Sequence, residues 1–337
     1  MEFAARGNCH NVLQPISIAR NISLEDYLMD TPVTRNRMVL PPDGDSMIPA
    51  HIRISPFLHT DLDRAYEDVD ETVAERLLEQ HLGRPGTLTS SGRHALALVL
   101  ADAGLGPDDT VTILTTTGNS YVSGCVTRTI GRLCRWSMTI EPSTRLIVVI
   151  HEWGIPYARV DELLKLGIPV AEDCAYAFAS THNGKTAGRE GTYAIFSLPK
   201  FFPINYGGVV CGVQQRVDML PEHRRAILNV VGSELPRLAS IREARIAAWH
   251  YLESRFAEIG CRPVLPLDSG TIPGVFMFQP HAGVVPEDIK HAYQLHGIEA
   301  SVFYPWHAVY VPCHQHLTPG AMDYIVAVYE QAARAKA

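Results

Sequence analysis

Short apolar segments alternate with segments of helical pattern between residues 87 and 212. The run RLIVVIH (145–151) is continuously apolar between Arg145 and His151, which is typical of a strand covered on both faces. Further strands are predicted at 87–91, 110–117, 168–173, 193–197 and 207–212, and helices at 94–104 and 157–167. Strands that alternate with helices at this spacing predict an α/β domain with a largely parallel sheet.

The segments on either side of this region lack the alternation. Residues 1–40 show no strong period and are predicted to form an N-terminal arm, followed by a large domain over 41–220. The remaining segment, 221–337, predicts a smaller α+β C-terminal domain with a long amphipathic helix at 235–260 and short strands near 274–280.

Two helices have clear end signals. A helix ending at Gly83 would place Val69, Val73 and Leu77 on one face, since they are four residues apart. The last helix is predicted at 318–335, with Thr318 as its N-cap and Pro319 in its first turn. Its buried stripe is predicted to be Met322, Ile325, Val326 and Tyr329.

Composition excludes several classes of protein. The 337 residues carry a formal charge of −7 with a pI near 6.1, which argues against a nucleic-acid partner. No apolar stretch approaches the ~20 residues of a membrane span, and the N-terminus lacks the apolar core of a signal peptide. Seven widely spaced cysteines without a CxxC pair indicate reduced thiols in a cytoplasmic protein rather than a disulfide framework or a zinc site. His314 and His316 beside Cys313 are interpreted as a polar loop, and no metal is predicted.

An acid and a lysine follow two of the predicted strands. Asp173 ends the strand at 168–173, and Lys200 comes just after the strand at 193–197. Ligands of open α/β sheets bind at the carboxyl ends of strands, where His151 and Ser197 also fall. A lysine and an acid so placed are the pair that holds pyridoxal phosphate (PLP): the amine forms a Schiff base with the aldehyde, and the carboxylate keeps the ring nitrogen protonated. A surface lysine and a capping aspartate are the alternatives.

The neighbours of Lys200 support the first interpretation. We expect apolar neighbours in the sequence to lower the pKa of the Lys200 amine. These neighbours are Phe196, Leu198, Phe201 and Phe202. Gly207 and Gly208 indicate a tight backbone approach.

The segment SSGRHAL (90–96) opens a helix whose first N–H groups, after Ser91, would bind the ester phosphate of PLP. An ordinary helix cap is the alternative. Tyr121 is a candidate to stack on the cofactor ring or to pack in the core. Ser197 is a candidate phosphate ligand or a plain strand residue, and His151 would line the site or be a satisfied core histidine.

Taken together, these segments resemble the DegT/StrS family of sugar aminotransferases, PLP enzymes of the aspartate aminotransferase fold (fold type I), from about residue 69 onward. The phosphate turn SGTxAL of that family is similar to residues 91–96, and its EDAAQ motif to residues 172–176. Its glycine-rich hairpin matches Gly184, Gly188 and Gly191, and its cofactor lysine followed by a Gly-Gly strand matches Lys200. Its tail LPxHxxLT…YI is similar to residues 311–318 with 324–325.

The resemblance implies a homodimer with the active site at the subunit interface, and small molecules as substrates. It implies transfer of an amino group, usually from glutamate, to a keto group on a nucleotide-linked sugar or cyclitol. Lys200 would hold PLP and shuttle the proton, and Asp173 would pair with the ring nitrogen. The backbone of Gly92, Arg93 and His94 would bind the phosphate.

Several residues depart from the family pattern. Arg93 replaces the usual Thr, Tyr176 the usual Gln or His that contacts the ring oxygen, and Ser197 lies three residues before the lysine instead of five. Two alternatives therefore stay open: other PLP chemistry on this scaffold (dehydration, decarboxylation or carbon–carbon bond formation), and a non-catalytic binding or regulatory relative. Lys200 disfavours the dehydratases, which have histidine there. In the segment FYPWHAVY (303–310), three residues would form either the acceptor pocket or a core aromatic cluster. They are Tyr304, Trp306 and His307.

Overall fold

The computed structural model describes residues 51–58, 61, 69–215 and 217–334. The predicted N-terminal arm, 1–40, lies outside the described residues. The described chain builds two main β-sheets, each with its own helices and hydrophobic core.

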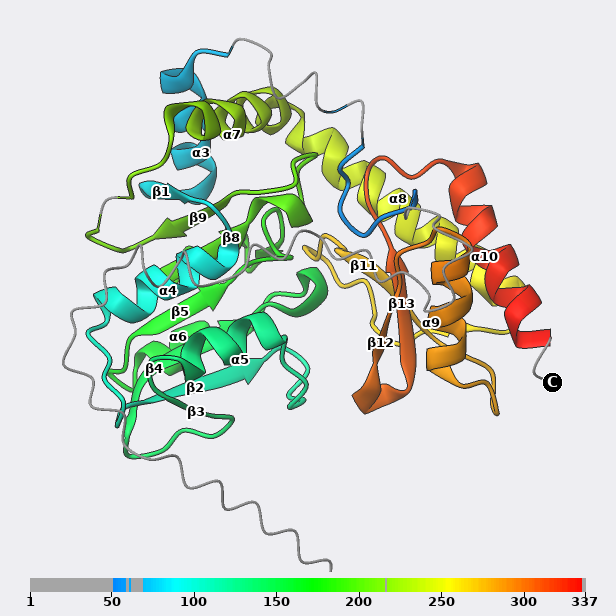
Figure 1. Ribbon diagram of the computed structural model, residues 1–337, viewed down its shortest axis with the longest axis horizontal. Helices are drawn as coiled ribbons and strands as arrows, with labels where there is room; N and C mark the ends of the chain where they lie inside the picture. Colours follow the sequence, from blue (N-terminus) through cyan, green and yellow to red (C-terminus); the bar gives the residue numbers. More distant parts are fainter. Residues whose placement is uncertain (1–50, 59–60, 62–68, 216, 335–337) are drawn as a thin grey trace, which may run out of the picture. The chain divides into compact units, whose positions relative to one another are not determined.

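Within the described residues, the larger sheet has seven strands in the order β1-β9-β8-β5-β4-β2-β3 (Figure 1). Their bounds are β1 (Gly86–Thr89), β2 (Thr110–Thr115), β3 (Arg135–Ser137), β4 (Thr144–Ile150), β5 (Val170–Asp173), β8 (Tyr193–Ser197) and β9 (Gly208–Cys211). β3, β2, β4, β5 and β8 pair in parallel, and β9 is antiparallel to both β8 and β1. The carboxyl ends of β2, β4, β5 and β8 therefore share one edge of the sheet.

Helices cover both faces of this sheet because successive strand residues point in opposite directions. Leu146 and Val148 of β4 pack on the side of α4 (Gly92–Asp102) and α5 (Gly124–Gly131). Ile147 and Val149 pack on the other side, with α6 (Val160–Leu164). On that side α3 (Glu71–Leu82) and α7 (Pro221–Glu234) cover β1, β8 and β9. The predicted α/β class with a mainly parallel sheet is confirmed.

The buried face of α3 differs from the predicted one. The helix begins after the N-cap Asp70 and ends at Gly83, whose φ of 73° is left-handed. Its buried residues are Ala74, Leu78 and Leu82, whereas the side chain of Val73 is 42% exposed. The predicted stripe lies one position too early because packing against α7, which the sequence pattern did not indicate, decides which face turns inward.

The smaller sheet is antiparallel in the order β10-β11-β13-β12. Its strands are β10 (Arg262–Pro263), β11 (Val275–Gln279), β12 (Ser301–Phe303) and β13 (Ala308–Pro312), packed with α8 (Leu238–Glu258), α9 (Pro286–Leu295) and α10 (Pro319–Arg334). Thr318 caps α10 by accepting a hydrogen bond from the Ala321 N–H (3.2 Å). The predicted buried stripe of α10 is confirmed. The small sheet with its helices is the predicted α+β unit.

Helix α8 contacts the cores of both sheets. Ile241, near its start, packs with the core around α3 and α7. Trp249 and Phe256, further along, pack in the core of the smaller sheet. The domain boundary between 220 and 221 stays a prediction. In the described part of the chain, no helix has the length and apolar character that crossing a membrane requires.

Candidate active site

Asp173 and Lys200 lie at the shared carboxyl edge of the larger sheet. Asp173 is the last residue of β5 and pairs with Ile150 on one side and Ile195 on the other. Lys200 ends the short 3₁₀ turn η2 (Leu198–Lys200), which follows β8 directly. His151 follows β4 and Ser197 ends β8, so the predicted positions at strand ends are confirmed.

The N-terminus of α4 is wedged against β9 and the end of β8. The Gly207 N–H donates to the Ser90 carbonyl (2.8 Å), and a Cβ on Gly208 would lie 2.6 Å from the Ser91 carbonyl carbon. A Cβ on Gly92 would lie 3.0 Å from Cβ of Ser197. The tight approach predicted from the Gly-Gly pair is thus made to the Ser91–Gly92 turn, at the start of α4, where Ser91 Oγ accepts the His94 N–H (3.2 Å) as an N-cap.

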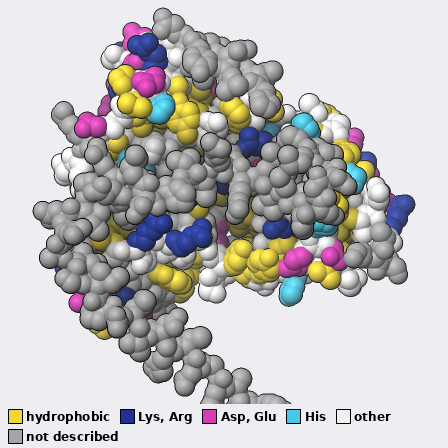
Figure 2. All heavy atoms as spheres, viewed as in Figure 1, with side chains coloured by type: hydrophobic (Ala, Val, Ile, Leu, Met, Phe, Trp, Pro, Cys, Tyr) yellow, Lys and Arg dark blue, Asp and Glu magenta, His cyan; other side chains and the backbone are white. Residues whose placement is uncertain are grey.

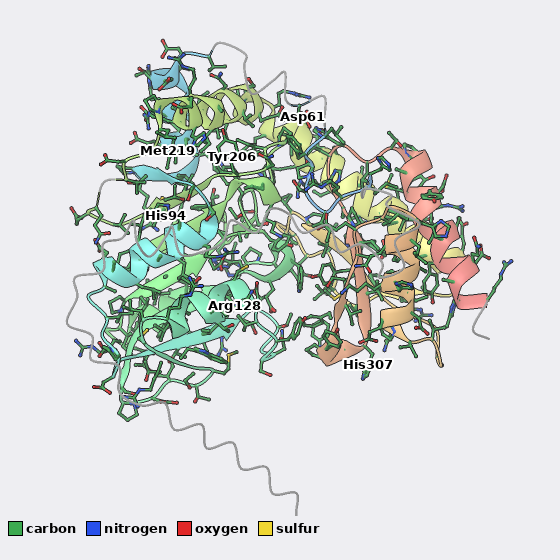
Figure 3. All side chains as sticks on the ribbon, in the orientation of Figure 1. Asp61, His94, Arg128, Tyr206, Met219 and His307 are labelled. Carbon is green, nitrogen blue, oxygen red and sulfur yellow. The ribbon has the colours of Figure 1, made fainter. Side chains whose placement is uncertain are left out.

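The imidazole of His94 is incompletely satisfied at this turn. His94 lies at the start of α4 (Figure 3), and its Nδ1 is 3.1 Å from Ser90 Oγ. Its Nε2 is buried, and none of the described residues forms a hydrogen bond with it. Burial lowers the pKa of His94. A buried polar atom left without a protein partner beside an anion-binding helix start fits a site that a bound group completes.

Positive charge gathers next to this turn. Figure 2 shows Lys and Arg side chains over α5, the helix of Arg128 (Figure 3). Arg93, exposed on α4, donates to Cys125 Sγ on α5 (3.3 Å). Burial would raise the pKa of the Cys125 thiol, but Arg93, Ser123 and Arg128 together lower it. These arginines therefore reinforce the positive end of α4.

Asp173 is a buried carboxyl, and its Oδ1 accepts a hydrogen bond from the Ala175 N–H (3.0 Å). Burial raises its pKa, against the opposing influences of Ala175, His151 and Lys200. A carboxyl in this state would be held ionised by a further cation beside it. This is the environment that the protonated ring nitrogen of PLP requires.

The amine of Lys200 contacts Tyr176, with Nζ 2.9 Å from the phenolic oxygen. The expectation that apolar neighbours lower the pKa of this amine is wrong. Tyr176 is the largest influence and raises that pKa; it outweighs burial, and Tyr310 and Glu299 act in the same direction. Phe201 and Phe202, which suggested a lower value, are buried in the core around α3 and α7.

Two of the aromatic residues predicted to line the site, Tyr121 and Tyr304, contact each other and Phe303. The side chain of Tyr121 is 41% exposed, and its ring lies edge-on to Phe303 and to Tyr304, each with a centroid distance of 5.6 Å. Trp306 packs edge-on against Phe303 (4.9 Å). His307 has a left-handed backbone (φ 49°) and an exposed side chain. Tyr121 and Tyr304 are thus brought together, and the His307 N–H donates to the Tyr304 carbonyl (3.3 Å).

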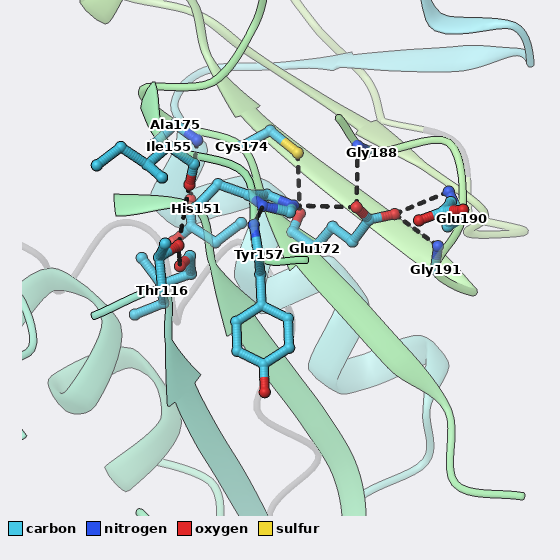
Figure 4. A network of polar contacts seen from close by, with 12 residues as sticks. Thr116, His151, Ile155, Tyr157, Glu172, Cys174, Ala175, Gly188, Glu190 and Gly191 are labelled. Atoms are coloured by element: carbon cyan, nitrogen blue, oxygen red, sulfur yellow. Dashed lines mark hydrogen bonds and ion pairs between the residues drawn. The ribbon is translucent and has the colours of Figure 1, made fainter. Parts of the chain in front are cut away.

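Glu172, next to Asp173, holds the glycine-rich hairpin in place (Figure 4). Its Oε2 accepts hydrogen bonds from His151 Nε2 (3.0 Å) and the Gly188 N–H (3.0 Å), and its Oε1 from the Glu190 (2.9 Å) and Gly191 (2.5 Å) N–H groups. Burial alone would raise the pKa of Glu172, but these bonds together lower it. Two motifs recognised separately in the sequence therefore meet at one carboxylate.

The same network fixes His151. Its Nδ1 accepts the Tyr157 N–H (2.8 Å), which leaves Nε2–H to donate to Glu172. Among the described residues, one trio has ligand atoms close enough for a metal ion: His151, Glu172 and Cys174. Their hydrogen bonds already engage the first two, and burial raises the pKa of the Cys174 thiol well above its usual range. The trio is therefore a structural network.

A buried arginine, missed by the sequence analysis, anchors the lysine's backbone. The side chain of Arg245 on α8 is 0% exposed and donates to the carbonyls of Lys200, Phe201 and Pro273 (each 3.2 Å) and to Gln315 Oε1 (2.9 Å). Its guanidinium also lies 4.4 Å from the Phe201 ring centroid. Burial lowers its pKa to about 10. No carboxylate forms an ion pair with it in the described part of the chain, and in the sequence it is one of three arginines in α8, with nothing to distinguish it from Arg242 and Arg255.

A cleft of about 1080 Å³ opens beside β2 and β4 and is lined mainly by residues 113–120, 155–159, 181–184 and 268–271. Glu152 organises its first segment by accepting from Thr117 Oγ1 (2.6 Å) and Asn119 Nδ2 (2.9 Å). Asn119 Oδ1 in turn accepts the Tyr121 N–H (2.6 Å). The cleft lining is therefore continuous with the residue expected to stack on the cofactor.

Comparison with known proteins connects this geometry to a family. Residues 135–214 match the model of the DegT/DnrJ/EryC1/StrS aminotransferase family. The L-glutamine:scyllo-inosose aminotransferase of Streptomyces griseus is 33% identical over 101 residues, 28% of this chain and 24% of that protein. The L-glutamine:2-deoxy-scyllo-inosose aminotransferase of Streptoalloteichus tenebrarius is 28% identical over 156 residues, 41% of this chain and 37% of that protein. The chain thus matches well under half the length of these relatives.

Solved structures share the fold over most of the chain. The aminotransferase TlmJ from Streptoalloteichus hindustanus has a TM-score of 0.66 at 16% identity and covers 86% of this chain and 99% of that chain. The PLP-form of Spr1654 from Streptococcus pneumoniae has a TM-score of 0.64 at 15% identity, covering 84% and 98%. The fold type I prediction is confirmed, and the family match supports PLP as the cofactor. The predicted resemblance is thus confirmed: residues 135–214 match the DegT/DnrJ/EryC1/StrS aminotransferase family, and the chain shares its fold with solved aminotransferases along most of its length.

Proposed function

We propose that this chain is a PLP-dependent aminotransferase that moves an amino group to a keto group on a polyhydroxylated small molecule. The observation that carries the proposal is the meeting of Asp173, Lys200 and the Ser91–Gly92 turn at one sheet edge. When bound, PLP supplies an electron sink for negative charge at the substrate carbon.

The residues of this chain would have distinct roles. Lys200 would hold the cofactor and carry the proton, and Asp173 would pair with the ring nitrogen. The backbone of Gly92, Arg93 and His94, with the hydroxyls of Ser91 and Ser197, would bind the phosphate. The rings of Tyr121 and Tyr176 would contact the cofactor ring. The position of Tyr176 beside Lys200 and that of Tyr121 beside Phe303 of the smaller sheet support these roles.

The substrates are part of the proposal. The names of the two curated relatives give L-glutamine as donor and an inosose as acceptor. We expect glutamate or glutamine as donor here, and a keto cyclitol or nucleotide-linked keto sugar as acceptor. The cleft beside Thr117 and Asn119 has room for such a ring and is lined with hydroxyl and amide groups. A homodimer with the site at the subunit interface, and a cytoplasmic location, are also proposed.

The test begins with the protein loaded with PLP. We expect a visible absorbance band that L-glutamine or L-glutamate bleaches and a keto cyclitol restores. Borohydride reduction followed by peptide mapping should tag Lys200, and Lys200→Ala should lack the band. Lys165→Ala, which removes a lysine exposed to solvent, is the matched control. A tag on another lysine would contradict the proposal, as would a band that no amine bleaches.

A further inference from the structure

The phenol of Tyr176 is aimed at the lysine amine. Its oxygen lies 2.9 Å from Lys200 Nζ, and Nζ is 4.6 Å from the centre of the ring. The two residues are 24 positions apart in sequence, and each follows a strand that ends at the shared edge, Tyr176 after β5 and Lys200 after β8. The contact is therefore a product of the sheet topology.

The position of the Tyr176 ring depends on the glycine at position 274. A Cβ on Gly274 would lie 2.4 Å from Tyr176 Cδ1, so only glycine leaves room for the ring. The Trp153 ring also packs against Tyr176, with a distance of 5.4 Å between ring centroids, and the Trp153 carbonyl accepts the Gly274 N–H (2.9 Å). Trp153 itself has a left-handed backbone (φ 57°), which is uncommon for a bulky residue and persists where surrounding contacts enforce it.

Tyr176 interacts with two cationic side chains. Besides Lys200, the buried guanidinium of Arg245 interacts electrostatically with Tyr176. Among the titratable groups that act on Lys200, Tyr176 has the largest effect, ahead of Tyr310 and Glu299, while Asp173 also lies within electrostatic range. A hydrogen bond that the Lys200 ammonium donates to the phenolic oxygen of Tyr176 is charge-assisted, and such bonds are stronger than those between neutral groups.

We propose that Tyr176 is a catalytic residue: its phenolic oxygen receives the Lys200 amine whenever that amine is not bonded to the cofactor, and keeps it aligned for proton transfer. This inference rests on the proposed function. Lys200 Nζ would take one proton from the substrate carbon and become an ammonium group held by Tyr176. It would then give that proton to the carbon of the bound cofactor and return to the neutral amine, so that one C–H bond breaks, another forms, and no electron is gained or lost.

Tyr176→Phe removes only the oxygen and tests the inference in the ligand-free protein. The apparent pKa of Lys200 can be followed by competitive labelling of amines across pH, with Lys165 as internal reference. We expect the labelling midpoint of Lys200 to fall by about one unit or more in the variant. Tyr310→Phe is the matched control, since its hydroxyl interacts with Ser301, and it should shift the midpoint much less.

A second readout is exchange of the amino donor's α-proton with deuterated solvent, which we expect to slow about 10- to 100-fold in Tyr176→Phe, with a smaller change in the donor KM. If that variant does not fold, Gly274→Ala, which displaces the ring, should lower the labelling midpoint in the same way. If Tyr176→Phe kept the wild-type labelling midpoint of Lys200 and the wild-type rate of α-proton exchange while it still bound PLP and remained active, the inference about Tyr176 would be overturned and the proposed function would stand. A wild-type protein that forms no link at Lys200 would instead overturn the proposed function.

Discussion

Glu172 and Asp173 are neighbours on β5 with opposite electrostatic states. The carboxylate of Glu172 is surrounded by donors, so its pKa lies below the ordinary value of 4.5. Asp173 is buried with few donors, so its pKa lies above its ordinary value. One acid therefore stabilises the fold as an anion, while the other is kept at a cost to the ligand-free protein that a cofactor cation would remove.

Asp173→Asn should raise the free energy of unfolding of the ligand-free protein near neutral pH and abolish tight PLP binding. The folded-state pKa of Asp173 is raised, so its contribution to stability is present below the unfolded-state pKa and is lost as pH rises through the folded one. Urea unfolding and PLP titration measure the two effects. A variant that is less stable near neutral pH, or that binds PLP as the wild type does, would contradict the assigned role.

The matched variant Glu172→Gln should behave in the opposite way. Because the folded-state pKa of Glu172 is lowered, its contribution is present above about 4.5 and is lost as pH falls through the folded value. Loss of its charged hydrogen bonds should lower the free energy of unfolding near neutral pH by about 3 kcal/mol. Glu253→Gln, at an exposed site, should change it by less than about 0.5 kcal/mol.

At the scale of elements, the sequence predicted what local pattern determines. The continuous apolar run of β4 predicted a strand buried on both faces, and the β-branched and apolar residues of β2, β5 and β8 predicted the others. The hydrophobic stripe of α10 follows from its own period. The face of α3 and the short strand β3 depend on distant partners, so local pattern could not fix them. The pKa direction at Lys200 failed for the same reason: Tyr176 approaches through tertiary structure.

Gly208→Ala tests the packing of β9 against α4. Its Cβ would lie 2.6 to 2.8 Å from backbone atoms of Ser91 and Gly92, which cannot move aside as a flexible side chain can. We expect the N-terminus of α4 to shift and PLP affinity to fall about 10-fold or more. Gly320→Ala, where a Cβ meets nothing within 4 Å, is the control. Equal PLP affinity in both variants, measured by fluorescence titration, would show that this turn does not bind the phosphate.

At the scale of the whole described chain, α8 links the two sheets through one buried cation. Its early residue Ile241 joins the core around α3 and α7, and its later residue Trp249 joins the core of the smaller sheet. Between them, Arg245 donates to carbonyls of Lys200 and Pro273, which lie on different segments. No sequence pattern could reveal this contact, because a buried arginine and a solvent-facing one look alike in an amphipathic helix.

Arg245→Met should loosen this link and misplace the lysine. The methionine fills most of the volume and removes the buried charge, but it leaves the carbonyls of Lys200 and Pro273 without the donor that Arg245 supplies. The Phe201 carbonyl keeps its hydrogen bond from Gln315 Nε2 (3.0 Å). Unsatisfied buried carbonyls cost about 1 to 3 kcal/mol each, so we expect a loss of about 3 kcal/mol in the free energy of unfolding, measured with urea. PLP affinity should fall with it, because the backbone that carries the amine is no longer fixed. Arg145→Met, at a site 69% exposed, should change neither quantity. If Arg245→Met retained both wild-type values, the guanidinium would be dispensable, and the position of Lys200 would have to be set by β8 and η2 alone.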